Sequence, residues 1–178
     1  MGLNITAYRS LKKAEGVETD EDGSPVDWGR YHYFSVGLME LTAENWGSRA
    51  EPIEPGIYEA TEKMKFGAGS YGRYNQWREW LAKAAGWPLG TFTSYNDEER
   101  STHAGAAWNA TEGPFWELIN FSDCEGIIGT TACAKLAKDF AEHREKILVG
   151  ADIWQADMYD VWHRAFVIGA DGGCVYFH

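Results

Sequence analysis

Aromatic side chains constrain this chain more than any other feature, because they are both numerous and large. Nine Trp, nine Tyr and eight Phe make up 15% of the 178 residues. A buried aromatic side chain removes about 150–250 Å² from water, and its ring packs against other rings at preferred angles. The chain must therefore fold around a core built largely from rings. Two or three rings outside such a core would suffice to stack on a planar ligand such as a nucleobase.

Length and charge restrict the class of protein further. A chain of 178 residues suits a single domain, 1–178, that buries about 70% of its unfolded surface. The formal net charge of −11 argues against direct coating of nucleic-acid backbones, which requires a basic face. No apolar run approaches the about 18 residues of a membrane span, and no signal-peptide pattern opens the chain. The three cysteines favour a reduced, cytoplasmic protein over a disulfide framework.

Hydrophobic periodicity predicts strands first, followed by a mixture of helices and strands. The expected strands cover residues 3–9, 31–39, 57–66, 115–121 and 174–178, with a short one at 92–95. The expected helices run from Ser70 to a cap at Gly86, over about 130–149, and over about 157–170. This order favours an α+β fold, with a mixed or antiparallel sheet packed against about three helices.

Two segments show no sustained period. Residues 15–27 contain six acidic and no basic side chains, and the tripeptide Gly-Ser-Pro lies near their end. This composition is typical of a solvated acidic loop or hairpin tip. Residues 87–114 are dense in Gly, Thr, Ser and Asn. A connection of that length is usually a functional loop or a lid, and we expect one of these at 87–114.

A glycine-rich segment lies where a strand meets the first expected helix. Gly67, Gly69 and Gly72 match the pattern G-x-G-x-x-G. The match is weak evidence for a dinucleotide-binding fold, because the preceding strand is charged and no acidic residue ends a second strand about 20 residues later. A tight turn capped by Ser70 is the simpler interpretation.

An anion site is the functional interpretation of the same segment. Amide N–H groups at a helix start attract negative charge, and two arginines follow on the same helix. Neighbouring rings would stack on the base of a nucleotide, and the lid 87–114 would close over it. The expected ligand-binding residues are Gly67, Gly69, Ser70, Tyr71, Arg73, Tyr74, Trp77 and Arg78.

The segment 120–126 offers a catalytic alternative. Cys124 could act as a nucleophile with His163 or His178 brought close by the fold. The two flanking carboxylates oppose this role, because they raise the pKa of a thiol. Local hydrogen bonds to the backbone and a small buried thiol explain the segment without catalysis. We favour no catalytic residue and keep one alternative set: Asp123, Cys124, Glu125 and His178.

The spacing of histidines and cysteines predicts no metal site. Five His and three Cys form no H-x-H, H-E-x-x-H or zinc-knuckle pattern. No P-loop or nucleophile elbow is present either. We therefore expect neither a metal nor a cofactor.

Three stretches together resemble a family of small uncharacterised proteins encoded by bacteriophages and prophages. They are 69–78, 119–137 with its motif INFSDCEG, and 170–178 with its motif ADGGxVxFH. The resemblance covers the chain from about Tyr58 onward and carries no assigned catalytic residues. It implies a phage accessory protein that acts in the host cytoplasm. Such genes commonly encode counter-defence factors, including proteins that sequester nucleotide second messengers.

These observations favour a non-enzymatic protein that binds and sequesters a small anionic, nucleotide-like ligand without turnover. Its sites could lie between the subunits of a homo-oligomer. Two alternatives stay open. One is a hydrolase of a nucleotide or an amide, and the other is a protein–protein inhibitor of a host defence factor that uses exposed Trp and Tyr side chains as anchors.

Overall fold

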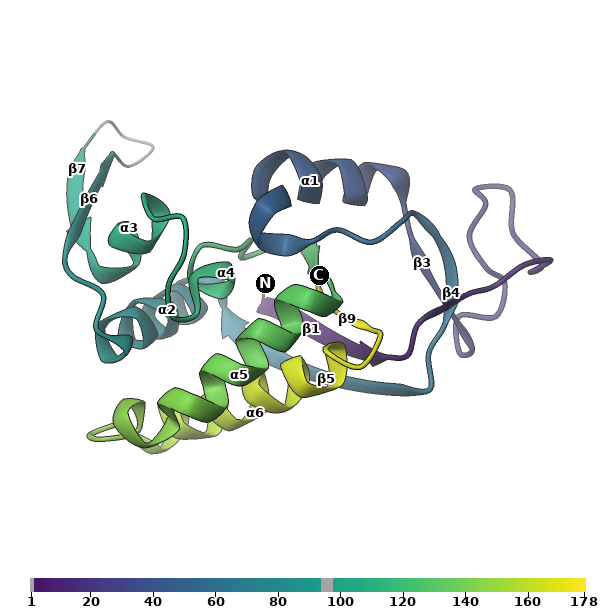
Figure 1. Ribbon diagram of the computed structural model, residues 1–178. Helices are drawn as coiled ribbons and strands as arrows, with labels where there is room; N and C mark the ends of the chain where they lie inside the picture. Colours follow the sequence, from purple (N-terminus) through teal and green to yellow (C-terminus); the bar gives the residue numbers. More distant parts are fainter. Residues whose placement is uncertain (1, 94–97) are drawn as a thin grey trace.

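Three strands open the chain, and helices and strands are mixed after them, in the computed structural model, which describes residues 2–93 and 98–178 (Figure 1). The strands are β1 (Gly2–Arg9), β2 (Lys12–Lys13), β3 (Tyr31–Phe34), β4 (Gly56–Glu59), β5 (Glu62–Ser70), β6 (Gly90–Thr93), β7 (Glu99–Thr102), β8 (Gly126–Ile128) and β9 (Cys174–Phe177). The helices are α1 (Val36–Ala50), α2 (Tyr71–Ala85), α3 (His103–Trp108), α4 (Trp116–Ile119), α5 (Thr130–Ile147) and α6 (Ile153–Gly169). The strand pairs are antiparallel, which confirms the α+β class.

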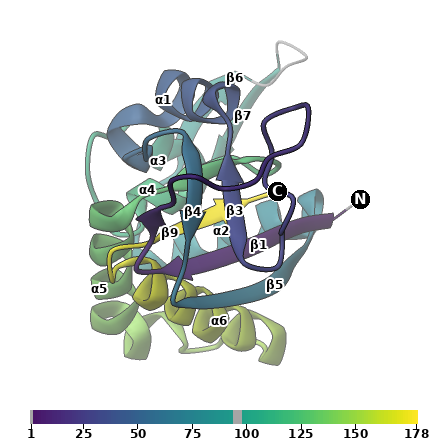
Figure 2. The same cartoon turned by 90° about the vertical axis from the view of Figure 1, so that its right-hand side faces the viewer.

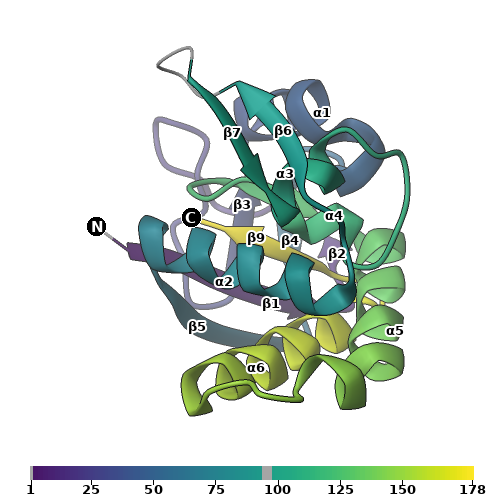
Figure 3. The same ribbon diagram turned by 90° about the vertical axis from the view of Figure 1, so that its left-hand side faces the viewer.

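The central sheet has the strand order β5–β1–β9–β8, so the first strand of the chain lies at its middle. Ile5 pairs with Phe66 on one side and with Phe177 on the other. Alternate residues of β1, Leu3, Ile5 and Ala7, are buried in the same cluster as side chains of α2, α5 and α6. These helices lie on one side of the sheet, with α5 and α6 side by side (Figures 1 and 3).

Stacked rings form the centre of this core. The ring of Trp162 lies 5.7 Å from Tyr74, 5.8 Å from Trp77 and 5.6 Å from Phe166, all at interplanar angles below 30°. Each of these four side chains is at most 1% exposed. The aromatic core expected from the composition is therefore present, and it joins α2 and α6.

The sequence predicted α2 at both of its ends. Ser70 Oγ accepts a hydrogen bond from the Arg73 amide, and Gly86 adopts a left-handed conformation with φ of 99°. Because only glycine adopts this conformation without strain, it ends the helix as predicted. The strands β1 and β9 and the helix α5 also lie where they were expected. Helix α6 begins four residues early, at a capping box of Asp152 and Gln155.

Two expected strands are corrected. The strand 31–39 ends at Phe34, because the Ser35 side chain caps helix α1 by accepting from the Leu38 amide. The strand 115–121 is instead the short helix α4, which follows Phe115 in a left-handed conformation with φ of 56°. The aromatic and branched side chains of both segments favoured extended structure, and their tertiary contacts outweighed that preference.

Two further expectations are corrected. The strand 57–66 is divided between β4 and β5, and β5 continues through the glycine-rich segment to Ser70. The lid 87–114 is not irregular, because it contains the β6–β7 hairpin and α3. The expected strand 92–95 is present in part, since residues 92 and 93 belong to β6 and residues 94 and 95 lie outside the described ranges. Within the described ranges, no helix is long and apolar enough to cross a membrane.

The second face of the sheet carries a smaller core. Strands β3 and β4 lie across this face (Figure 2), and Phe34 packs against Tyr8, Tyr58 and Tyr176. The acidic segment 15–27 is an exposed extension with one bridge, between Thr19 and Pro25.

Acid should destabilise the fold through His32 in this smaller core. Burial, together with the positive charges of Lys63 and Lys65, lowers the pKa of His32 from 6.5 to about 4. The unfolded chain therefore binds more protons between pH 6.5 and pH 4, so stability falls as the pH falls through this window. Between pH 7 and pH 5 we expect the free energy of unfolding to fall by about 2 kcal/mol less in His32→Phe than in the parent chain.

Urea unfolding of the parent and of His32→Phe at the two pH values measures this difference. An unchanged pH dependence in the variant would contradict the assignment to His32.

Candidate functional site

A cleft of about 400 Å³ opens between α2, the β6–β7 hairpin and α3. We call it the α2–α3 cleft. Figure 3 shows the hairpin standing above α2 with α3 beside it. Its polar lining comes from three segments of the chain and comprises Asn75, Arg78, Glu79, Arg100, Thr102 and Asp123. Its apolar lining includes Phe92 and Trp108.

Arg78 is the most deeply placed charge of the cleft, since it is only 8% exposed. Its guanidinium donates to the carbonyl oxygen of Phe121 and to Oδ1 of Asn75, and it lies 4.5 Å from the ring centre of Tyr74. Its direct partners are thus neutral groups and a ring rather than a carboxylate. Burying a charge is costly unless it is paired, so a cation in this setting favours negative charge nearby.

Asn75 connects Arg78 to Asp123. The Asn75 amide donates from Nδ2 to Oδ2 of Asp123 over 2.9 Å, while its Oδ1 accepts from Arg78. These two bonds fix the orientation of the amide. In the described part of the chain, no donor bonds to the other oxygen of Asp123, Oδ1. One carboxylate oxygen at the cleft therefore remains available as an acceptor.

Glu79 fixes the opposite side of the cleft. Its two oxygens accept the backbone amides of His103 and Ala104, each over 2.8 Å, so α2 holds the start of α3 directly. Thr102 adds a cap by accepting from the Gly105 amide. The carboxylate of Glu79 is thereby occupied by backbone donors and is less available to a ligand than Asp123.

The rim of the cleft combines rings with a cation. Phe92 and Trp108 lie 5.2 Å apart with an interplanar angle of 44°. Trp108 is 52% exposed, which is unusual for so large an apolar side chain. The exposed Arg100 side chain pairs with Glu98 over 2.8 Å. Exposed ion pairs of this kind contribute little stability, so Arg100 can exchange its partner at small cost.

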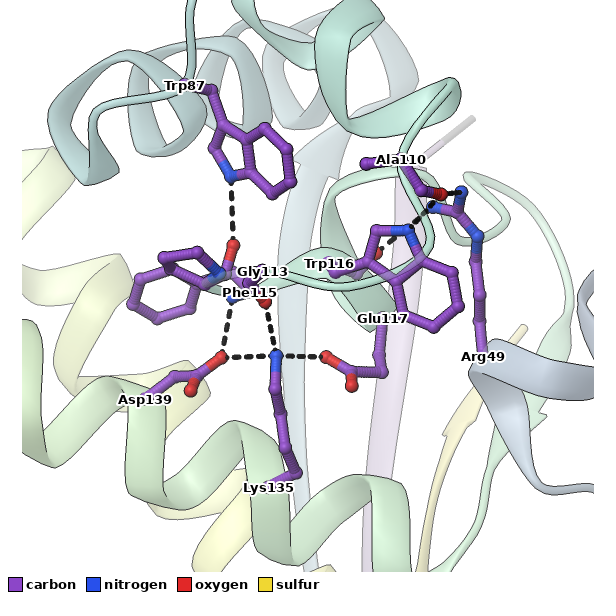
Figure 4. A network of polar contacts seen from close by, with 10 residues as sticks. Arg49, Trp87, Ala110, Gly113, Phe115, Trp116, Glu117, Lys135 and Asp139 are labelled. Atoms are coloured by element: carbon purple, nitrogen blue, oxygen red, sulfur yellow. Dashed lines mark hydrogen bonds and ion pairs between the residues drawn. The ribbon is translucent and has the colours of Figure 1, made fainter.

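A buried network holds the segment that leads from α3 to α4 (Figure 4). Lys135 Nζ lies 2.7 Å from carboxylate oxygens of both Glu117 and Asp139, and it donates to the carbonyl of Gly113. Asp139 also accepts the Phe115 amide over 2.6 Å. Burial raises the pKa of Glu117, and the hydrogen bond from Lys135 opposes this shift. Since Ile119 of α4 lines the cleft, this network supports its floor.

Arg49 holds the same segment from the other side, as Figure 4 shows. Its guanidinium donates to carbonyl oxygens of Ala107, Trp108, Ala110 and Trp116, and it stacks on the Trp116 ring at 4.2 Å. Because its hydrogen-bond partners are neutral carbonyl oxygens, Arg49 fixes the backbone of this segment and does not neutralise a carboxylate. The position of Trp108 at the rim therefore depends on Arg49.

The glycine-rich segment is placed differently from a phosphate-binding loop. Gly67 and Gly69 pair with β1 as part of β5, and the Ser70 side chain already caps the first turn of α2. Arg73 stacks on the ring of Trp154 at 4.1 Å. Tyr71 is partly buried against the main core. Of the expected set, Arg78 is the residue that lines the α2–α3 cleft.

Of the three rings expected to stack on a ligand, Tyr71, Tyr74 and Trp77, the last two are corrected. Tyr74 and Trp77 are 0% and 1% exposed, and both stack on Trp162. Helical spacing placed them on the inner face of α2, so the core covers their ring faces. The available rings of the cleft, Phe92 and Trp108, come from the hairpin and α3 instead.

The side chains of the alternative catalytic set have separate hydrogen-bond partners and form no common site. Cys124 is exposed, and its amide and thiol interact with Ser122 Oγ. His178 bonds through Nε2 to Thr6 Oγ1, and His163 stacks on Phe140. Ser122 also accepts the amide of Glu125, which is a local bond of the kind that the structural interpretation expected, but the buried thiol of that interpretation is wrong, because Cys124 is exposed. Asp123 is the member of the set that lines the cleft.

Most of the residues that line the cleft were not predicted from the sequence. Asn75, Glu79, Phe92, Arg100 and Trp108 were not expected as site residues. Thr102 could have indicated the start of α3 from the sequence, because a Thr side chain typically caps a helix by accepting the backbone amide three residues later, here that of Gly105. Pairing of the hairpin strands, which brings Phe92 opposite Arg100, had no local signal.

Comparison with known proteins gives no relative for this chain. No family model, no curated protein and no solved structure matches it. Among the described side chains, no group of three or more His, Cys, Asp or Glu is arranged to hold a metal ion.

Removing Lys135 should destabilise the fold strongly. Lys135→Ala would leave two mostly buried carboxylates facing each other, and we expect a loss of about 3 kcal/mol in the free energy of unfolding. Lys138→Ala is a matched control on the same helix, because Lys138 is exposed and lies 3.7 Å from Glu142. We expect it to change stability by less than about 0.5 kcal/mol.

Urea denaturation of both variants measures the contrast. Equal effects of the two substitutions on the free energy of unfolding would contradict a stabilising role of the Lys135 network.

Proposed function

We propose that this protein binds a small anionic ligand with a planar, nucleotide-like group in the α2–α3 cleft and holds it without turnover. The observation that carries the proposal is that guanidinium groups from α2 and from the hairpin line the same cleft as a partly exposed ring pair. Rings and guanidinium groups are what a nucleotide requires, since the base stacks and the phosphate accepts charged hydrogen bonds.

The charge arrangement supports an anion at this place although the whole chain is acidic. Glu79 is occupied by two backbone amides, while the Arg78 guanidinium has no direct carboxylate partner among the contacts of the described residues. Arg100 can leave its exposed pair with Glu98. Arg100 is therefore available to a ligand phosphate or carboxylate by contact, while the buried Arg78 acts on it through its field.

The surroundings of the nucleophile candidate favour holding over turnover. A thiol nucleophile needs a neighbouring base, and the hydrogen bonds of Cys124 and of its amide go to Ser122. His178, the expected base, is bonded to Thr6. A binding protein therefore fits these contacts better than a hydrolase does.

The resemblance to phage-encoded proteins supplies a setting for this activity. A phage accessory protein that binds a nucleotide tightly in the host cytoplasm would lower the free concentration of a host signal. That role, counter-defence by sequestration, belongs to the proposal.

Calorimetric titration with GMP and AMP tests the site. We expect binding of at least one nucleotide to the parent chain and about tenfold weaker binding to Arg100→Ala, the equivalent of about 1.4 kcal/mol. Arg164→Ala is the matched control, because Arg164 is exposed on α6 and outside the cleft lining. We expect it to bind like the parent.

Two results would contradict this proposal. One is equal affinity of the parent and Arg100→Ala. The other is recovery of altered nucleotide after incubation and heat release, which would favour the hydrolase. If Cys124→Ala then abolished turnover with folding intact, the hydrolase alternative would replace sequestration.

A further inference from the structure

Building on the proposed function, we infer that the α2–α3 cleft selects a planar group that presents neighbouring N–H donors at one edge, as guanine does. Asp123 is the carboxylate of the cleft that is not saturated by the protein, so the base edge that it accepts decides which ligand binds.

Asp123 is positioned by a chain of fixed bonds. Arg78 donates to Asn75 Oδ1, which turns the Asn75 Nδ2 group toward Oδ2 of Asp123. Arg78 is itself fixed by the Phe121 carbonyl and by the ring of Tyr74. Asp123 is therefore bonded by the exposed Asn75 side chain, whose amide is oriented by the buried Arg78 guanidinium, and the direction of the carboxylate is preset.

The free oxygen of Asp123 can only accept hydrogen bonds unless it is protonated. Guanine presents the N1–H and N2–H donors side by side, and the carboxylate can accept both, one on the free Oδ1 and one on the second lone pair of Oδ2, whose first is taken by Asn75. Adenine places its N1 acceptor at the corresponding point, which would face a carboxylate oxygen without a proton between them. Hypoxanthine keeps N1–H but lacks the second donor. The expected order of affinity is therefore guanine, then hypoxanthine, then adenine.

The same carboxylate orients the rest of the ligand. A phosphate beside Asp123 would be repelled, whereas Arg100 on the hairpin offers a cation whose present partner is exposed. The base would then lie against the ring pair of Phe92 and Trp108, between the carboxylate and Arg100. A site that bonds a ligand N–H discriminates against an analogue that lacks it, because the acceptor then loses its partner, and Asp123 is half-buried, so water replaces that partner only in part.

Competition among GMP, IMP and AMP tests the inference, with the three nucleotides titrated separately into the folded chain. We expect GMP to bind at least about tenfold more tightly than AMP, with IMP between them. Asp123→Asn has nearly the same shape and can present an amide N–H to the adenine N1. We expect it to remove the preference for GMP and to leave AMP binding unchanged or tighter.

Glu142→Gln is the matched control, since it removes one carboxylate charge from the exposed face of α5. We expect it to keep the order of the three nucleotides. Asn75→Ala is a second variant that leaves Asp123 in place but removes its positioning bond, and we expect it to reduce the preference partly. Circular dichroism and thermal unfolding establish that each variant is folded.

Two failures are distinguishable. Equal binding of the three nucleotides to the parent, with weaker binding to Arg100→Ala, would overturn the inference and keep the proposed function. An order that is the same in the parent and in Asp123→Asn would also overturn it. Absence of binding by all three nucleotides would overturn the inference together with the proposed function.

Discussion

The buried guanidinium of Arg78 determines how the cleft is built. Its N–H groups need acceptors once they leave water, and the Phe121 carbonyl and Asn75 supply them. The first bond fastens the segment after α4 to α2, and the second orients the amide that holds Asp123. A single charged side chain therefore brings residues 75 and 123 together. Replacing it would disturb the position of the only carboxylate in the cleft lining that has a free oxygen among the described contacts.

The remaining sides of the cleft depend on two other anchors. Glu79 joins α2 to α3 through backbone amides, and Lys135 with Arg49 fixes the segment between α3 and α4. In each case a charged side chain bonds to backbone groups at the ends of the short helices α3 and α4 or in the segment between them. Because such groups have no partner within a helix or a sheet, these side chains satisfy their hydrogen bonds. The cleft therefore has rigid support although its lining lies partly on a hairpin.

Local signals predicted some elements well and others poorly. Ser70 and Gly86 mark both ends of α2, because a capping side chain and a left-handed glycine act on their immediate neighbours. The cap of α1 at Ser35 is equally local, but the aromatic residues before it favoured one long strand. The segment 115–121 is rich in strand-forming residues and still forms α4, since Lys135 and Asp139 bind the backbone around Phe115. That outcome depends on contacts about 20 residues away in sequence.

The cleft was predictable only in part for the same reason. Arg78 and Asp123 were both singled out, yet as members of separate sites, because nothing local shows that Asn75 joins them. Helical spacing places Tyr74 and Trp77 on the apolar stripe of α2 that faces the core, so the expectation that they stack on a ligand was wrong. The hairpin that supplies Phe92 and Arg100 lies in a segment that shows no sustained hydrophobic periodicity.

A crystal structure of the protein grown with GMP tests the central claim most directly. We expect electron density in the α2–α3 cleft, with the base against Trp108, its N–H edge on Asp123 and its phosphate within hydrogen-bond distance of Arg100. Density for the nucleotide at the amino end of α2, beside Ser70 and Arg73, or an empty cleft in crystals soaked at saturating GMP, would contradict it.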